Sequence, residues 1–223
     1  MISERVIRAQ AFRQFAPCRP EEDFRLAGAL TAAVVAACLL VLAPAGAGSA
    51  AAATVTVDAD RGADTIDIRA SAVLVTDAAT AWRVLTDYDR YADFIPDLHT
   101  SRVVSRHGTT VTVEQSGDAG LWLIKVPISV TFEIDEMAPT RLQSRAIAGG
   151  LRELTSCYVL TPVPSGLRMD YVGRVTPRFA LFGQIEVAAV ERNIARQFQA
   201  LADEIERQAA EARARQVANA GKP

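Results

Sequence analysis

The sequence has few of the side chains that most catalytic and metal sites require. Its 223 residues include only two histidines and three cysteines. No segment matches the short motifs that hold a nucleophilic serine, a nucleotide phosphate, a dinucleotide or a catalytic zinc ion. His99 and His107 both stand beside predicted turns, with no set of cysteine or histidine ligands near them. We therefore expect no catalytic residues of these kinds, no metal site and no cofactor.

An excess of charge is also missing. Lys and Arg together number 24 and Asp and Glu 26, which gives a formal net charge of -2. This balance argues against a nucleic-acid partner, because such partners select strongly basic surfaces. Half of the residues are hydrophobic, enough for a sizeable core, although aromatic residues make up only 6%. Length and composition allow one folded domain or a small pair.

Cysteine is too scarce to form a disulfide within the predicted domain. Cys18 and Cys38 precede that domain, which leaves only Cys157 inside it. Because Cys157 falls within a predicted strand, we interpret it as a small apolar residue rather than as a nucleophile.

The N-terminal region has the order of a secretory signal peptide. Residues Leu26 to Leu42 carry no charge, and five arginines precede them. Pro44 then interrupts the apolar run, and Ala45-Gly46-Ala47 supplies small residues of the kind found at cleavage sites. The sequence therefore predicts an exported protein, periplasmic or at the outer face of the inner membrane, whose signal peptide is cleaved.

Two alternatives remain open for this region. An uncleaved segment could attach the chain to the membrane through residues 26–45, because about 17 apolar residues reach the lower limit for crossing a bilayer. Val35-Ala36-Ala37-Cys38 also resembles the lipid-attachment motif of lipoproteins. We divide the chain into residues 1–47 (signal peptide or membrane anchor), 48–63 (linker), 64–208 (folded domain) and 209–223 (frayed C-terminal tail).

Alternating apolar residues predict a series of strands in the folded domain. The clearest alternation covers Trp122 to Ile134, where every second residue is apolar. Pro127 inside this run indicates an edge position or a bulge, because proline has no amide hydrogen for a partner strand. Further strands are predicted at residues 65–75, 101–106, 109–115, 141–147, 153–162 and 167–176. Two short helical pieces, at 78–86 and 88–98, follow the first strand, and either Thr76 or Asp77 can cap the first piece.

One long helix is predicted at the end of the domain, from about Gly183 to Gln208. Its apolar residues recur every three or four positions and form one stripe: Val187, Val190, Ile194, Phe198, Leu201 and Ile205. This stripe must be buried, and the apolar face of the sheet is the available partner. The order of elements therefore predicts an α+β fold in which an antiparallel sheet packs on a C-terminal helix.

Two segments resemble a known family. Residues Trp82 to Pro96, with Val84-Leu85-Thr86-Asp87-Tyr88 followed by Phe94-Ile95-Pro96, are similar to the early part of bacterial SRPBCC (START-like) proteins. Val113-Glu114-Gln115-Ser116-Gly117 matches the same family. Its members are often labelled polyketide cyclase/dehydrase or coenzyme Q-binding START-domain proteins. The resemblance covers Thr65 to Arg207 and implies a helix-grip (START/Bet v 1-like) fold, in which a curved antiparallel sheet wraps around a long C-terminal helix above a hydrophobic cavity.

The resemblance and the missing catalytic motifs together favour a binding protein. We expect an exported carrier of a small hydrophobic ligand, such as a lipid, a quinone or an aromatic metabolite. One alternative is a polyketide cyclase- or dehydratase-like enzyme that works in the same cavity, and another is an interaction protein whose groove takes a partner helix or the membrane surface. The residues expected to contact the ligand are Tyr88, Tyr91, Phe94, Ile95, Trp122, Phe132, Tyr158, Met169, Tyr171, Phe179, Phe182 and Phe198.

Four arginines on or near predicted strands allow two interpretations. Arg145, Arg152, Arg168 and Arg174 could supply one inward side chain that anchors a carboxylate or a quinone oxygen. The alternative, which we favour, is that they are exposed and pair with acidic residues such as Glu153 or Asp170.

Overall fold

One antiparallel sheet and one long helix make up most of the described residues. The structure is a computed structural model that describes residues 53–121, 124–176 and 184–220. The chain divides into two units, Met1–Ala45 and Gly46–Pro223, and only the second contains described residues. Its elements are β1 (Val55–Arg61), β2 (Ile66–Leu74), α3 (Ala78–Leu85), η1 (Tyr88–Arg90), α4 (Tyr91–Phe94), β3 (Leu98–His107), β4 (Thr110–Leu121), β5 (Ile124–Met137), β6 (Arg141–Gly149), β7 (Glu153–Val163), β8 (Gly166–Thr176) and α5 (Gln184–Ala220).

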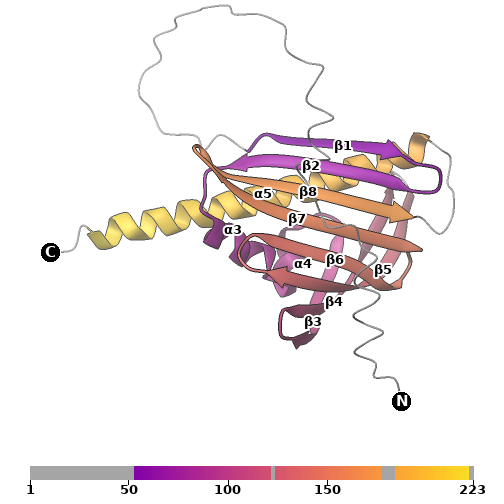
Figure 1. Ribbon diagram of the computed structural model, residues 1–223, viewed down its shortest axis with the longest axis horizontal. Coiled ribbons are helices and arrows are strands. Elements are labelled where there is room, and N and C mark those ends of the chain that lie inside the picture. The colour runs from indigo at the N-terminus through magenta and orange to yellow at the C-terminus, as the bar shows by residue number, and fades with distance from the viewer. Residues whose placement is uncertain (1–52, 122–123, 177–183, 221–223) are drawn as a thin grey trace, which may run out of the picture. The chain divides into compact units, whose positions relative to one another are not determined.

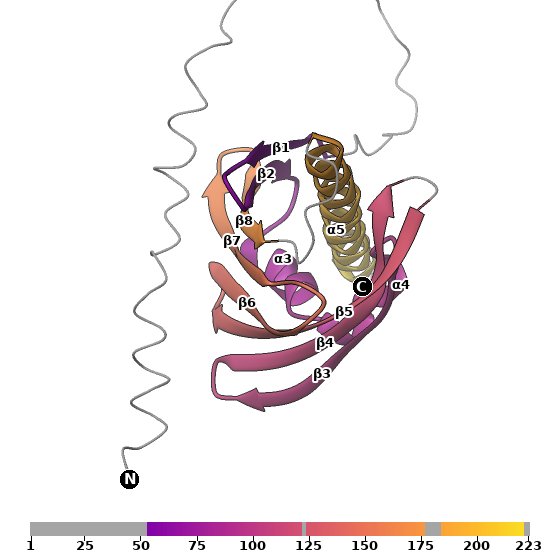
Figure 2. The ribbon, with the colours of Figure 1, turned by 90° about the vertical axis from the view of Figure 1, so that its right-hand side faces the viewer.

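The strands lie in the order β1-β2-β8-β7-β6-β5-β4-β3, and every neighbouring pair is antiparallel. Strands β3 to β8 follow one another as hairpins, and β8 pairs with β2, which joins β1 and β2 to the other strands (Figure 1). The sheet curves around the long helix, so that β1 and β3 lie at its two ends (Figure 2). The predicted α+β helix-grip fold is therefore confirmed.

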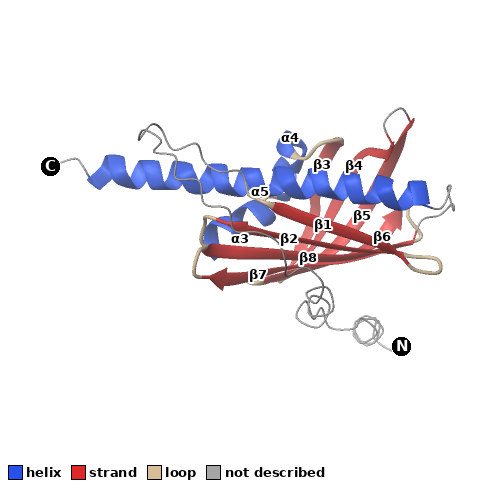
Figure 3. Cartoon of the chain, turned by 90° about the horizontal axis from the view of Figure 1, so that it is seen from above, coloured by secondary structure: helices blue, strands red, loops and turns tan. Residues whose placement is uncertain are grey.

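Alternation along the strands directs one row of side chains toward α5. In β2 the inward row is Ile66, Ile68, Ala70, Ala72 and Leu74, and none of these side chains is more than 2% exposed. The small alanines let β2 and the backbone of α5 approach each other closely. α5 also contacts β1, β4, α3 and α4. It therefore crosses the concave side of the sheet along the β1–β2 end and reaches the strands of the other end at β4 (Figure 3).

The short helices close one end of the sheet, and a local capping bond sets where α3 begins. The Asp77 carboxylate accepts a hydrogen bond from the backbone N–H of Thr80 at 2.8 Å, which satisfies one of the first-turn donors. That bond lowers the pKa of Asp77. After η1, the Tyr91 hydroxyl donates to the carbonyl oxygen of Leu85 at 2.7 Å and holds α4 against the end of α3.

Two of the predicted boundaries need correction. The segment predicted as a linker, residues 48–63, contains β1, whose Val55, Val57 and Ala59 pack against the core. The predicted frayed tail is helical as far as Ala220. Arg207 and Glu211, four positions apart, are joined by a hydrogen-bonded ion pair on this extension, a local pairing that supports an exposed helix.

Pro127 occupies a local edge, although β5 itself lies inside the sheet. The pairing of β5 with β4 extends from Thr110 opposite Asp135 as far as Leu121 opposite Ile124. Its pairing with β6 begins only at Val130, opposite Gly149. Pro127 therefore has a partner strand on one side only, and the edge position predicted for it is confirmed.

Candidate functional site

The inner face of the sheet is covered unequally. The inward residues of β2 and β8 are buried, including Ile68, Leu74 and Met169, each 0% exposed. The inward Phe132 of β5 and Leu154 and Tyr158 of β7 are only half-buried, although they pack against the same core. Water therefore reaches part of the inner face at β5 to β7, although Ile134, Leu142 and Leu160 on the same strands are buried.

One stretch of α5 is covered just as incompletely. Val187, Phe198, Leu201 and Ile205 are at most 7% exposed, whereas Val190 and Ile194, on the same stripe, are half-buried. The half-buried residues of the helix and those of the sheet pack against the same hydrophobic core. We call the inner-face residues Phe132, Leu154, Tyr158, Val190 and Ile194 the candidate site.

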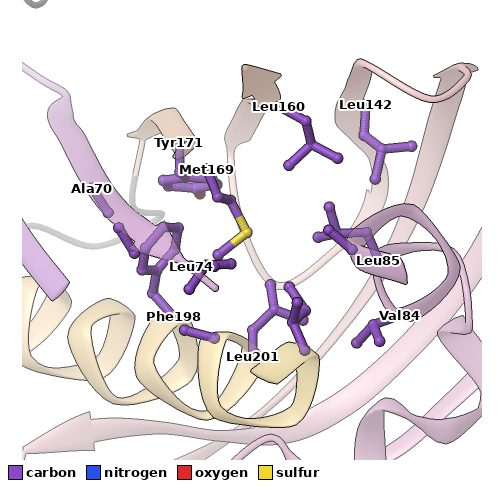
Figure 4. Close-up of a cluster of buried hydrophobic side chains, with 14 of the residues drawn as sticks. Ala70, Leu74, Val84, Leu85, Leu142, Leu160, Met169, Tyr171, Phe198 and Leu201 are labelled. Carbon is purple, nitrogen blue, oxygen red and sulfur yellow. The ribbon is translucent and has the colours of Figure 1, made fainter. Parts of the chain in front are cut away.

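An aromatic cluster forms the inner wall of the candidate site. The rings of Tyr158 and Phe198 are stacked with centroids 6.2 Å apart, and Tyr171 lies 4.8 Å from Tyr158 and 6.4 Å from Phe198. Figure 4 shows Phe198 and Leu201 on α5 facing Tyr171, Met169 and Leu74 on the sheet. This cluster joins the half-buried Tyr158 to the buried Tyr171 and Phe198.

Hydroxyl groups stand among these apolar residues on three adjacent strands. Ser144 on β6 and Ser156 on β7 are directly paired, and their hydroxyl oxygens lie 2.7 Å apart. Burial raises the pKa of Tyr171 on β8 to about 12, and the nearby Ser156 hydroxyl has a smaller effect that lowers it. Burial also raises the pKa of Tyr158. Both tyrosines are therefore neutral at physiological pH and can donate hydrogen bonds.

The aromatic side chains after α3 line one end of the concave side. Tyr88, Tyr91 and Phe94 form an edge-to-face series with successive centroids 5.7 Å apart. The Tyr88 hydroxyl donates to the Glu136 carboxylate at 3.1 Å, and that carboxylate also accepts from Arg106 at 2.7 Å. Burial, followed by the charge of Glu136, raises the pKa of Tyr88. These bonds fix the buried Tyr88, whereas Tyr91 and Phe94 are half-buried.

Charged residues tie α5 to the opposite rim. Asp97 follows α4 and has a positive φ of 60°, which asparagine and aspartate tolerate better than most residues. Its carboxylate accepts hydrogen bonds from Arg196 of α5 and from Lys125 of β5, the latter at 3.1 Å. Gly117 opposite it is required, because a Cβ there would lie 2.2 Å from the Asp97 carbonyl oxygen. We call Asp97, Lys125 and Arg196 the rim cluster.

The residues predicted to contact a ligand fall into three groups. Met169, Tyr88, Tyr171 and Phe198 are buried, and their side chains contribute to the packed core. Half-buried residues face the concave side or its end: Tyr91, Phe94, Ile95, Phe132 and Tyr158. Trp122, Phe179 and Phe182 lie outside the described residues. Ligand contact by these twelve residues stays a prediction.

Sequence reasoning missed the two serines of the site. Ser156 lies between Leu154 and Tyr158 at an alternate position of β7, so its inward direction was readable from the strand pattern. Its partner Ser144 was not readable, because the pairing of β6 with β7 depends on the register between the strands.

The arginines do not supply a charged anchor inside the described site. Arg145 pairs with Glu133, Arg168 with Asp170 at 2.8 Å, and Arg174 with Asp67, all from positions that alternate with inward residues. The favoured interpretation, pairing with acidic residues, is confirmed for these three, including the predicted partner Asp170. Arg152 is exposed.

Cys157 differs from its interpretation as a lone apolar thiol. It lies in β7, is 6% exposed and is disulfide-bonded. Its burial agrees with the interpretation as an apolar residue, whereas the free thiol which that interpretation assumed is wrong.

Neither metal chemistry nor a membrane span is indicated within residues 53–121, 124–176 and 184–220. No group of three or more His, Cys, Asp or Glu side chains there could hold a metal ion. None of the helices in the same ranges is both long and apolar enough to cross a bilayer. The predicted signal peptide or anchor, residues 1–47, lies outside the described residues.

Solved structures share this fold at low sequence identity. A STAR-related lipid transfer protein from Xanthomonas axonopodis matches with a TM-score of 0.58 and 16% identity, over 71% of this chain and 96% of that chain. The Zhui aromatase/cyclase from Streptomyces sp. R1128 matches with a TM-score of 0.56 and 16% identity, over 65% and 95%. A protein from Thermus thermophilus has a TM-score of 0.56 and 14% identity, over 66% and 98%.

The sequence itself matches one family model over most of the folded unit. No curated protein matches the chain. The model described as polyketide cyclase / dehydrase and lipid transport matches residues 65–209, more than half of the chain. These limits coincide with the strands β2 to β8 and the packed part of α5. The chain therefore belongs to the polyketide cyclase / dehydrase and lipid transport family, within the START/SRPBCC superfamily.

Proposed function

We propose that this protein binds one small hydrophobic molecule, a lipid, a quinone or an aromatic metabolite, between α5 and the inner face of β5 to β7. The observation that carries this proposal is the half-buried apolar surface of the candidate site, next to a filled core on the same sheet. The family and the fold are those of hydrophobic-ligand binding or polyketide cyclase-like proteins.

The energetics of the site favour an apolar occupant. Removing apolar surface from water stabilises a complex by about 25 cal/mol per Å². A molecule seated on Phe132, Leu154 and Ile194 removes both its own surface and theirs from water. The site is also bordered by rigid aromatic rings, so a ligand there orders few additional side chains.

We further propose that the protein works outside the cytoplasm. The support is the sequence order at residues 1–47: arginines, an uncharged apolar run and small residues. Cell fractionation tests it, together with the N-terminal sequence of the purified protein. A protein that starts near residue 48 supports cleavage, an intact chain in the membrane supports an anchor, and an intact chain in the cytoplasm overturns the proposal.

The experiment for ligand binding uses the full chain as purified from cells. Native mass spectrometry detects a bound molecule as added mass, and extraction with organic solvent followed by mass spectrometry identifies it. The purified protein is then titrated with a panel of fatty acids, phospholipids, quinones and polycyclic aromatics. We expect at least one co-purified molecule or one member of the panel to bind with one molecule per chain. Absence of both overturns the proposal.

A second function, cyclisation or dehydration of a polyketide-like chain, is favoured by one observation. The hydroxyls of Ser144, Ser156 and Tyr171 converge on the inner face, and the neutral Tyr171 can donate a hydrogen bond that polarises a carbonyl. The test is incubation with a β-hydroxyketone, with loss of water to the enone followed by absorbance. Turnover that Tyr171→Phe abolishes supports an enzyme, and binding without turnover supports a carrier.

A further inference from the structure

Three hydroxyl groups gather on the inner face of the sheet, and each comes from a different strand. Ser144 on β6 and Ser156 on β7 lie opposite each other, with their oxygens 2.7 Å apart. The Tyr171 hydroxyl from β8 lies over Gly173, which is the residue paired with Ser156. We call these three residues the hydroxyl row.

The sheet register explains why the third hydroxyl reaches the other two. Ser156 is paired with Gly173, two residues after Tyr171 on β8. A side chain at position 173 would meet the tyrosine, because a Cβ there would lie 2.6 Å from the Tyr171 hydroxyl oxygen. The absence of that Cβ lets the phenol fold over Gly173 toward Ser156. The tyrosine ring is held in this direction by Tyr158 and Phe198.

The hydroxyl row has unused hydrogen-bonding capacity. Three hydroxyl groups carry three hydrogens, and the bond between Ser144 and Ser156 uses one of them. Hydrogens are therefore left to donate, and lone pairs are left to accept. No buried side-chain nitrogen or oxygen of the described residues is without a partner, so the remaining capacity lies where solvent or a ligand can meet it. Both serines are half-buried, which agrees with that position.

The surroundings of the row are neutral. The arginines on the same strands lie at outward positions: Arg141, Arg145, Arg168 and Arg174. The last three pair with Glu133, Asp170 and Asp67, respectively. Glu136, on the inner side of β5, is engaged by Tyr88 and Arg106. An ionised ligand group at the row would lose water without gaining an opposite charge, whereas an uncharged oxygen would exchange one hydrogen bond for another.

We propose that the hydroxyl row binds an uncharged oxygen, a carbonyl or a hydroxyl, of an otherwise apolar ligand. The protein then selects molecules with such an oxygen over plain hydrocarbons and over carboxylates of the same size. This inference rests on the proposed function, because it assigns the polar contact of the same site.

The test compares three probes that share one ring system: naphthalene, 1-naphthol and 1-naphthoate. The full chain is titrated with each at pH 7, and binding is followed by the fluorescence of the probe. We expect 1-naphthol to bind about fivefold or more tightly than naphthalene, the typical effect of one hydrogen bond, and 1-naphthoate to bind most weakly. In Ser156→Ala and Tyr171→Phe, affinity for 1-naphthol should fall about fivefold while affinity for naphthalene stays within twofold.

Control variants separate the row from general effects on the fold. Ser165→Ala removes an exposed hydroxyl in the turn between β7 and β8 and should change no affinity. Ser144→Ala gives a second disruption of the row from another strand, and circular dichroism melting confirms that each variant is folded. Two results would overturn this inference and leave the proposed function standing. One is that naphthalene and 1-naphthol bind equally well and no variant changes either affinity. The other is that 1-naphthoate binds most tightly. Failure of the wild-type chain to bind any of the three probes overturns this inference and counts against the proposed function as well.

Discussion

The two parts of α5 carry the same apolar stripe but are packed differently. From Phe198 onward the stripe is buried against β2 and α3, with Leu201 3% and Ile205 0% exposed. Before Phe198, Val190 and Ile194 face the inner side of the sheet and are only half-buried, although Val187 at the start of the stripe is 7% exposed. The difference follows from the curvature of the sheet, since a straight helix cannot stay close to every strand of a bent surface. The part from Phe198 onward therefore stabilises the fold, and Val190 and Ile194 leave apolar surface accessible.

The largest expected effect is the loss of stability in Phe198→Ala. Phe198 is 2% exposed and contacts Tyr158 and Tyr171, so its removal leaves a cavity in the filled core. We expect the free energy of unfolding to fall by about 3–5 kcal/mol, measured by urea denaturation. Ile194→Ala is the matched control on the less covered part of the helix, and it should cost clearly less. Equal losses for the two variants would remove the distinction between the two parts of α5.

Filling the candidate site should weaken ligand binding and leave the stability of the fold almost unchanged. In Ile194→Trp the larger side chain occupies space over the half-buried face of β5 to β7 and needs no room inside the core. We expect ligand affinity to fall at least about tenfold, equivalent to about 1.4 kcal/mol, with a melting temperature near that of the wild type. Isothermal titration with the identified ligand measures the first quantity. Unchanged affinity would place the ligand elsewhere.

The capping bond of α3 should also contribute to stability, because α3 packs against the buried part of α5. Asp77→Ala removes the acceptor for the Thr80 N–H and should lower the free energy of unfolding by about 1 kcal/mol. The pKa of Asp77 is lower in the folded state than in the unfolded chain, so the carboxylate stabilises the fold above its unfolded pKa. This contribution is lost as the pH falls below about 4 toward the folded pKa. The difference in the free energy of unfolding between wild type and Asp77→Ala should therefore shrink at low pH. A difference that does not depend on pH would contradict this role of the Asp77 carboxylate.

The sequence predicted the fold well because its signals are local. Alternation in β5 and the apolar stripe of α5 each lie within one segment, and both elements were found. β1 was missed because Val55 and Val57 are short apolar signals after an alanine-rich stretch, and their burial depends on α5, far along the chain. The helical extension beyond Gln208 was missed because it has no apolar stripe, only residues that favour helix and pair with each other.

The site was less predictable than the fold for a physical reason. Sequence alternation places Tyr158 on the inner face, but it cannot state how far α5 stands from that face. The distance depends on the bend of the whole sheet and on the small residues of β2, Ala70 and Ala72, which bring the helix close at one end. Which aromatic residues are core and which remain accessible is therefore a property of the assembled fold.

The smallest expected effect on stability comes from the rim cluster, which ties the less covered part of α5 to the loop after α4. Asp97→Asn keeps a residue type that tolerates the positive φ of 60° and removes the charge that Lys125 and Arg196 share. Because exposed ion pairs contribute about 0–1 kcal/mol, the free energy of unfolding should change by less than about 1 kcal/mol. Release of the bound ligand, followed by stopped-flow fluorescence, should nevertheless become faster, since Arg196 joins this part of the helix to the loop after α4. Arg102→Gln is the matched control, because it breaks the exposed pair with Glu114 elsewhere on the sheet and should leave the release rate unchanged. A release rate unaffected by Asp97→Asn, or affected equally by Arg102→Gln, would show that the rim cluster does not hold α5 over the ligand.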